Sequence, residues 1–234
     1  DLTPVCVSGE CLVCVPNSTN CDGKDIVQCD SEGSALTVLE TCPDGQTCFG
    51  EGECALDGEQ VANITIFDAQ NKATVAIHPE DFFLVIWTSQ NASPDNIDNS
   101  GKSIVGRWFF NDGTAHPAHP LEFVANTFIA GNQSDPSVAI NNNGIAMVSW
   151  MSGGQDGSGD GIYARRLTMD DGLVGVEFLV NEISTGAQSF PQVSALKDNR
   201  FAVVWESDNE DGDARGIILR IFEESGVPST GNII

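Results

Sequence analysis

Several features are missing from this 234-residue sequence, and each absence excludes a class of protein. Only 10 basic residues stand against 34 acidic ones, and the net charge of −24 repels nucleic acid and anionic membranes. The longest apolar run, from Phe82 to Trp87, is far too short to cross a bilayer. The chain does not open on a basic segment followed by an apolar one, so we expect a signal peptide to be removed or not included. We therefore expect a secreted, periplasmic or cell-surface protein without nucleic-acid binding or membrane insertion.

Common catalytic motifs are also missing. The sequence contains no Gly-x-Ser-x-Gly, no phosphate-binding loop and no His-Glu-x-x-His. A pair of carboxylates could still hydrolyse a glycosidic bond, but nothing among 34 acidic residues shows which pair that would be. We therefore assign no catalytic residue, and the expectation is a protein that is not an enzyme.

Cysteine is absent after residue 54, and all eight cysteines lie before that point. The same segment has no histidine and a single Cys-x-x-Cys, so disulfides are favoured over a zinc site. Residues 1–55 are expected to form a small module held together by these bridges, whose pairing the spacing does not decide. The cysteines expected to be bridged are Cys6, Cys11, Cys14, Cys21, Cys29, Cys42, Cys48 and Cys54.

From Val61 onward a motif returns three times. Each copy has a Gln, then an apolar strand that ends in Trp-x-Ser, then an Arg on the following strand. The second and third copies are 55 residues apart, as Trp150 and Trp205 show, whereas Trp87 precedes Trp150 by 63. A repeat of this length with about four short strands is typical of propeller blades.

The predicted fold is therefore all-β, with the disulfide-rich module followed by a β-repeat domain at 61–234. This domain would hold three four-stranded propeller-like units, at about 61–123, 124–178 and 179–234. A closed propeller has four to eight blades, so three units leave strand edges open. The propeller would be incomplete or completed by an oligomer, and we expect protein partners or self-assembly through the open β edges.

Two sets of repeat-equivalent residues admit a functional and a structural interpretation. The tryptophans could be sugar platforms, but their place at the end of a buried strand favours a core role. The arginines could clamp a carboxylate, as in sialidases, yet they alternate with apolar residues, which favours structural pairing. Glu122 and Glu177 are the expected partners of the first two arginines. The residues in question are Trp87, Trp150, Trp205, Arg107, Arg165 and Arg220.

An acidic, glycine-rich loop precedes the Arg strand of the second unit. It places oxygen-bearing side chains at alternate positions before Gly161, as in the first half of a calcium loop. The distal Glu of an EF-hand is absent, and an Asp-capped turn without an ion is the alternative. Lys102 and Arg215 stand at the equivalent positions of the other units and are expected to neutralise their loops. The candidate calcium ligands are Asp156, Ser158 and Asp160.

The first unit carries an insertion, His116-Pro-Ala-His119-Pro, that the other units lack. Two imidazoles at this spacing could bind a transition metal, but no third ligand stands nearby in the sequence. An exposed, rigid loop is the favoured interpretation, and the insertion is the best place for contacts specific to this unit.

Two parts of the chain resemble known families. The run from Cys14 through Cys42-Pro-Asp-Gly-Gln-Thr-Cys48 to Cys54 resembles the cysteine-rich modules of secreted or surface proteins from myxobacteria and relatives. The segment with Ser149-Trp-Met-Ser, Asp156-Gly-Ser-Gly-Asp-Gly and Glu177-Phe-Leu-Val-Asn is similar to tandem β-propeller-like repeats of large bacterial exported proteins. This resemblance implies calcium association or an adhesion-like role.

The leading hypothesis from the sequence is a non-catalytic exported or cell-surface protein for binding or structural assembly, stabilised by calcium. Two alternatives stay open. One is a glycan-binding, lectin-like propeller, although the single tyrosine in the chain offers few aromatic platforms. The other is a glycosidase or a related hydrolase on a propeller scaffold.

Overall fold

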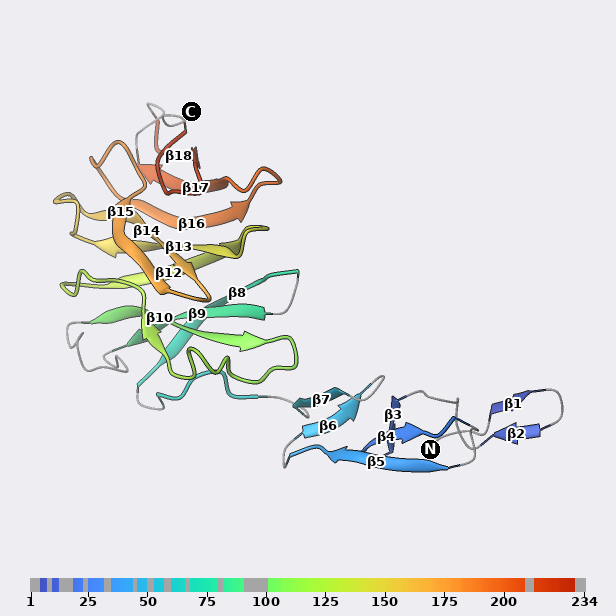
Figure 1. The fold of residues 1–234 in the computed structure, drawn as a ribbon. Helices are drawn as coiled ribbons and strands as arrows, with labels where there is room; N and C mark the ends of the chain where they lie inside the picture. The colour runs from blue at the N-terminus through green and yellow to red at the C-terminus, as the bar shows by residue number, and fades with distance from the viewer. Residues whose placement is uncertain are drawn as a thin grey trace. The chain divides into compact units, whose positions relative to one another are not determined.

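The computed structural model describes residues 5–7, 10–12, 19–22, 25–31, 35–43, 46–49, 53–56, 60–65, 68–79, 82–90, 101–208 and 213–229. Within these ranges the chain is built of β-strands and turns without a helix, which confirms the predicted all-β class (Figure 1). No helix that could cross a membrane occurs among the residues described. The chain divides into two compact units, which are described separately. They are Asp1–Val61 with Asp112–Thr114, and Ala62–Asn111 with Ala115–Ile234.

The first unit consists of short antiparallel ladders. Its strands are β1 (Val5–Val7) paired with β2 (Glu10–Leu12), the sheet β3 (Thr19–Asp22), β4 (Asp25–Cys29) and β5 (Leu36–Thr41), and β6 (Gln46–Phe49) paired with β7 (Glu53–Leu56). A disulfide joins Cys42 to Cys54, and Cys29 and Cys48 are also disulfide-bonded. The buried residues of this unit among those described are Val27, Cys29, Cys42 and Cys48, as expected where a segment is too short for a large apolar core. The side chains of the other four cysteines lie outside the described residues.

Three antiparallel sheets make up the second unit. The first is β8 (Gln70–Ile77), β9 (Phe82–Gln90), β10 (Lys102–Phe110) and β11 (Phe123–Val124). The second is β12 (Gln133–Ile140), β13 (Ile145–Gly153), β14 (Asp160–Thr168) and β15 (Gly172–Leu179). The third is β16 (Gln188–Ala195), β17 (Phe201–Asp208) and β18 (Arg215–Phe222).

In each sheet the strands pair in chain order, and the three sheets follow one another without closing into a ring (Figure 1). The fourth strand expected in the third unit would fall near residues 230–234, which lie outside the described part of the chain. Short turns such as 142–144 and 197–199 join neighbouring strands, in keeping with their Asn, Asp and Gly content.

The second sheet is apolar on both faces because it is packed between the other two. Ala146, Val148 and Trp150 face one cluster, which includes residues of the first sheet. The neighbouring position Met147 faces the other cluster, together with Trp205 of the third sheet. This alternation follows from the period of two along a strand, and it explains why the strand reads as a continuous apolar run.

Asn and Gln side chains at repeat-equivalent positions stabilise the connections between successive sheets. Asn126 accepts a hydrogen bond at Oδ1 from the Ile104 amide at 2.8 Å, and its Nδ2 donates to the Phe128 carbonyl at 3.0 Å. Gln133, which is fully buried, donates to the Ala130 carbonyl at 3.1 Å. Asn181 and Gln188 make the equivalent bonds in the next connection, to Ile162, Ile183 and Thr185. These polar groups are retained in the repeat because they satisfy buried backbone groups.

Candidate functional site

The first strand of every sheet in the second unit contains a bulge near its beginning. The residue two positions after the repeat Gln has a left-handed backbone in all three, with φ of 57°, 54° and 54°. Such a conformation is unfavourable for a residue other than glycine, and unfavourable conformations cluster at functional sites. The three bulge residues are Lys72, Asp135 and Phe190.

These bulges share one hollow of about 320 Å³, which we name the bulge hollow. It forms because β12 lies in contact with both β8 and β16, so equivalent positions of the three strands come together. The residues that line it are Lys72, Ala73 and Thr74 of β8, Asp135 and Pro136 of β12, and Phe190, Pro191 and Gln192 of β16.

The polar groups of the bulge hollow include a fixed ion pair. Lys72 Nζ lies 3.2 Å from Asp135 Oδ1, and the Asp135 side chain is 18% exposed whereas that of Lys72 is 60% exposed. Phe190 is half exposed at 50%, which is unusual for a large apolar side chain of a strand. A carboxylate acceptor, an ammonium donor, an amide and an open aromatic ring thus meet in one hollow, and they suit a ligand with hydroxyl groups and an apolar face.

Asp135 is the single acidic residue that lines the bulge hollow among the residues described. Hydrolysis of a glycosidic bond usually takes two carboxyl groups, one as acid and one as base or nucleophile. Among the described residues, the lining of the bulge hollow therefore supplies one of the two carboxyl groups. Sequence reasoning missed this site because its three residues share no chemistry. The available signal was their common position, two residues after Gln70, Gln133 or Gln188.

The candidate calcium loop adopts a turn closed by its own aspartate. Asp156 Oδ1 accepts a hydrogen bond from the Ser158 amide at 2.9 Å, which is the Asp-capped turn. The other oxygen, Oδ2, is buried without a hydrogen-bond partner. A Cβ at Gly161 would lie 2.7 Å from that oxygen, so a larger residue here would displace the Asp156 carboxylate. The described residues hold no cluster of three or more His, Cys, Asp or Glu side chains suited to a metal, and calcium at Asp156, Ser158 and Asp160 remains a prediction.

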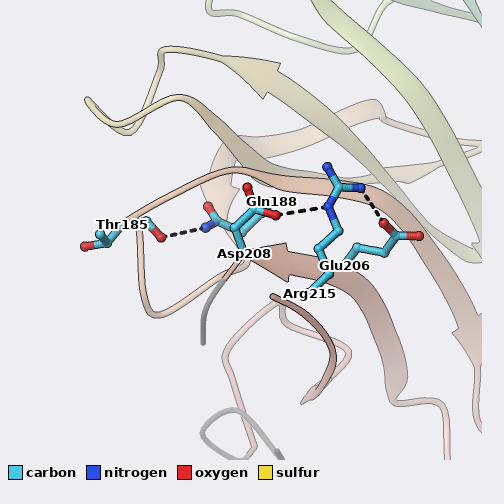
Figure 2. A network of polar contacts seen from close by, with 5 residues as sticks. All are labelled: Thr185, Gln188, Glu206, Asp208 and Arg215. Carbon is cyan, nitrogen blue, oxygen red and sulfur yellow. Dashed lines mark hydrogen bonds and ion pairs between the residues drawn. The ribbon is translucent and has the colours of Figure 1, made fainter. Parts of the chain in front are cut away.

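The two cations expected to neutralise the equivalent loops differ in what the structure describes. Arg215 lies between two carboxylates of β17, with Nε 3.0 Å from Asp208 Oδ1 and Nη1 2.8 Å from Glu206 Oε2 (Figure 2). These bonds, led by that to Glu206, raise the pKa of Arg215. Its partners therefore include the preceding strand, which the sequence pattern did not suggest. Lys102 begins β10, and the loop before it, 91–100, lies outside the described residues.

The repeat arginines bind backbone carbonyls at the start of their own unit. Arg107, Arg165 and Arg220 donate through Nη1 at 3.1, 3.0 and 2.8 Å. Arg165 is buried, which lowers its pKa, and its Nη2 also donates to the Gly175 carbonyl at 2.8 Å. The geometry is that of a structural clasp. The acceptors of the three Nη1 groups are the carbonyls of Ala62, Ala125 and Val180.

The expected pairing of Glu122 and Glu177 with arginine is wrong. Both carboxylates instead accept hydrogen bonds from backbone amides of the connection that leads into their sheet. Glu122 binds the amides of Ile64 and Thr65, and Glu177 those of Thr127 and Phe128. Two adjacent free amides attract a carboxylate strongly, since such charge-assisted bonds are stronger than neutral ones.

The remaining predicted residues are placed as follows. The repeat tryptophans are at most 4% exposed and lie in the apolar interior. The His116 ring packs on Phe110 with centroids 4.4 Å apart, and His119 Nε2 lies 2.6 Å from the carbonyl oxygen of Met169, which lies between β14 and β15. Burial, followed by the nearby His119, lowers the pKa of His116, while Asp170 opposes this shift. The insertion is therefore tied to the neighbouring sheet.

No protein-family model and no curated protein sequence matches this chain. Among solved structures, it is similar to a Hadza microbial sialidase, Hz136, with a TM-score of 0.50 and 12% identity over 82% of this chain and 43% of the sialidase. It is also similar to an α-L-arabinofuranosidase from Lactobacillus brevis, with a TM-score of 0.46 and 12% identity over 88% and 65% of the two chains. The chain thus spans less than two thirds of the length of either protein.

The likeness to the sialidase corrects the leading hypothesis from the sequence. A non-catalytic exported protein for binding or structural assembly was expected, whereas the similar structure is that of a sialidase. At 12% identity this likeness concerns the scaffold alone.

Proposed function

We propose that this chain is a propeller-like part of a carbohydrate-active enzyme, and that the bulge hollow holds its glycan. The observation that carries the proposal is the meeting of Lys72, Asp135 and Phe190 at three equivalent, conformationally unfavourable positions. Loops and irregular strand positions on a rigid β scaffold are where binding residues are usually placed.

Each side chain has a role that follows from its chemistry. The Phe190 ring would stack on the apolar face of a sugar, and the Asp135 carboxylate would accept hydrogen bonds from hydroxyl groups. Lys72 holds that carboxylate in place at 3.2 Å and has donors left for the ligand. In a hydrolytic reaction Asp135 would serve as one of the two carboxyl groups, either as proton donor or as base.

Export belongs to the same proposal. The disulfide between Cys42 and Cys54 is typical of oxidising compartments, where extracellular glycans are also met. A calcium ion at the Asp156 loop would stabilise the scaffold, because the buried and unpartnered Oδ2 suits a hard cation with oxygen ligands.

The test combines a glycan array with a reducing-end release assay on a panel of polysaccharides. Wild type should bind a restricted set of glycans, and Asp135→Asn and Phe190→Ala should each weaken binding at least tenfold. Asp198→Asn is the matched control, because this exposed carboxylate lies outside the bulge hollow and pairs with Arg200. The proposal is refuted if wild type neither binds a glycan nor releases reducing ends. It is also refuted if Asp135→Asn binds and releases as wild type does.

A further inference from the structure

The two charged side chains that line the bulge hollow are paired with each other. Lys72 Nζ of β8 lies 3.2 Å from Asp135 Oδ1 of β12, so their charges cancel where the first and second sheets meet. The other described residues of the lining carry no ionisable side chain. The wall of the bulge hollow is therefore electrically neutral, although it belongs to a chain with a net charge of −24.

This ion pair selects ligands by the hydrogen bonds that they can make. The Asp135 carboxylate only accepts hydrogen bonds, and the Lys72 ammonium only donates them. A ligand carboxylate cannot donate to Asp135, and a ligand ammonium cannot accept from Lys72. A hydroxyl group both donates and accepts, so adjacent hydroxyl groups of a sugar can bind both members of the pair without bringing a charge.

A charged ligand would also meet a like charge in the bulge hollow. The Asp135 side chain is 18% exposed, and partly buried charges are screened little by salt. A ligand carboxylate or sulfate that binds Lys72 would lie beside this carboxylate, and a ligand ammonium that binds Asp135 would lie beside Lys72. The negative field of the whole chain adds to the repulsion of anionic sugars.

The arginines of the chain, which could bind an anionic sugar in a bidentate manner, are engaged with groups of the protein itself. Three bind backbone carbonyls at the start of their own unit. Arg166 donates to the Glu224 carbonyl at 3.3 Å, and Arg200 and Arg215 are paired with carboxylates. The described lining of the bulge hollow contains no arginine, so its one cation is the paired Lys72.

The apolar part of the bulge hollow comes from a different strand than Lys72. Phe190, half exposed at 50%, and Pro191 belong to β16, and β12 is in contact with both β16 and β8. The bulge hollow thus combines an open aromatic ring with a neutral ion pair. This combination suits a sugar whose ring face is apolar and whose edge carries hydroxyl groups.

We propose that the Lys72–Asp135 ion pair makes the bulge hollow specific for uncharged glycans. Uronic acids, sulfated sugars and free amino sugars are excluded, because each brings a charge that one member of the pair repels. The inference rests on the proposed function, since it names the substrate class of the same site. It goes beyond that function, which requires a glycan of any charge.

A glycan array of matched pairs tests the inference. It holds each uronic acid oligosaccharide beside its methyl ester, each sulfated one beside its desulfated form, and each amino sugar one beside its N-acetylated form. Wild type should bind the neutral member about tenfold or more tightly than the charged member of every pair that it recognises, since juxtaposed like charges are costly. Its binding of neutral members should not change with salt concentration.

Two substitutions should shift this preference in opposite directions. Asp135→Asn leaves the Lys72 ammonium unpaired, so the preference for methyl ester over uronate should fall about tenfold and uronate binding should weaken with salt. Lys72→Met leaves the carboxylate unpaired and should lower the preference for N-acetylated over free amino sugars in the same way. Asp198→Asn and Lys197→Met make the same changes in net charge at exposed positions outside the bulge hollow, and they should keep the wild-type preference.

Tryptophan fluorescence shows whether each variant is folded, because three tryptophans lie in the apolar clusters between the sheets. A wild type that binds no glycan, or that binds as well after Phe190→Ala, refutes the proposed function and this inference together. A wild type that loses binding in Phe190→Ala but prefers the charged members refutes this inference alone. An unchanged preference in either Asp135→Asn or Lys72→Met also refutes it alone.

Discussion

Replacing Arg165 by Met removes the most buried of the three arginine clasps. The guanidinium donates to the carbonyls of Ala125 and Gly175, at 3.0 and 2.8 Å, and it is the one repeat arginine whose side chain is buried. Methionine has similar length and no donors, so both carbonyls would lose these bonds while the space stays filled.

The expected cost follows from these two bonds. A hydrogen bond from a charged group contributes about 1.5–3 kcal/mol to stability, and two would contribute about 3–6 kcal/mol. Arg165 Nε is buried without a partner, and relief of that penalty offsets part of the loss. We therefore expect the free energy of unfolding to fall by about 3 kcal/mol. With a urea m-value of about 2 kcal/mol/M, the midpoint should fall by about 1.5 M.

Urea unfolding followed by tryptophan fluorescence is the assay, since Trp108, Trp150 and Trp205 lie in the apolar clusters between the sheets. Arg165→Lys keeps the charge but lacks the forked donors, so its midpoint should lie between those of wild type and Arg165→Met. Arg200→Ala removes an exposed arginine paired with Asp198 and should leave the midpoint unchanged. If Arg165→Met shifts the midpoint no more than Arg200→Ala does, the clasp interpretation is refuted.

Three further predictions concern the loop, the tyrosine and the disulfides. Calcium should raise the melting temperature of wild type and EDTA should lower it, whereas Asp156→Asn should respond to neither; equal responses would remove the calcium site. Burial, followed by the nearby Asp156 and Glu177, raises the pKa of Tyr163, which is the only tyrosine in the sequence. Ultraviolet titration should therefore give a pKa above the usual value of about 10, and Asp156→Asn should lower that pKa. Because the folded state holds this proton more tightly, the stability it contributes is complete below about pH 10 and is lost as pH rises through the folded pKa. Dithiothreitol should leave the tryptophan-monitored melt unchanged, since cysteine is absent after residue 54, and a lowered melting temperature would show coupling between the units.

The all-β class and the repeat of three could be predicted because they are local patterns. The period of two along each apolar strand and the recurrence of Trp150 at Trp205 are visible without any contact between distant residues. The sequence alone did not reveal which groups pair. Glu177 was expected to bind Arg165, but two free amides lie at the entrance to the second sheet and bind it instead, an arrangement that depends on how the chain returns from one sheet to the next.

In the candidate site, too, the sequence determined one part and the tertiary structure another. The chain by itself determined where the repeats begin, and therefore that Lys72, Asp135 and Phe190 are equivalent positions. Only the tertiary structure decided that these positions matter, because 63 and 55 residues separate them and their side chains share no chemistry. Side-by-side contact of β8, β12 and β16 converts three unrelated residues into one hollow. It also decides which copies of an apolar position are buried and which, like Val75 and Ile217, are exposed.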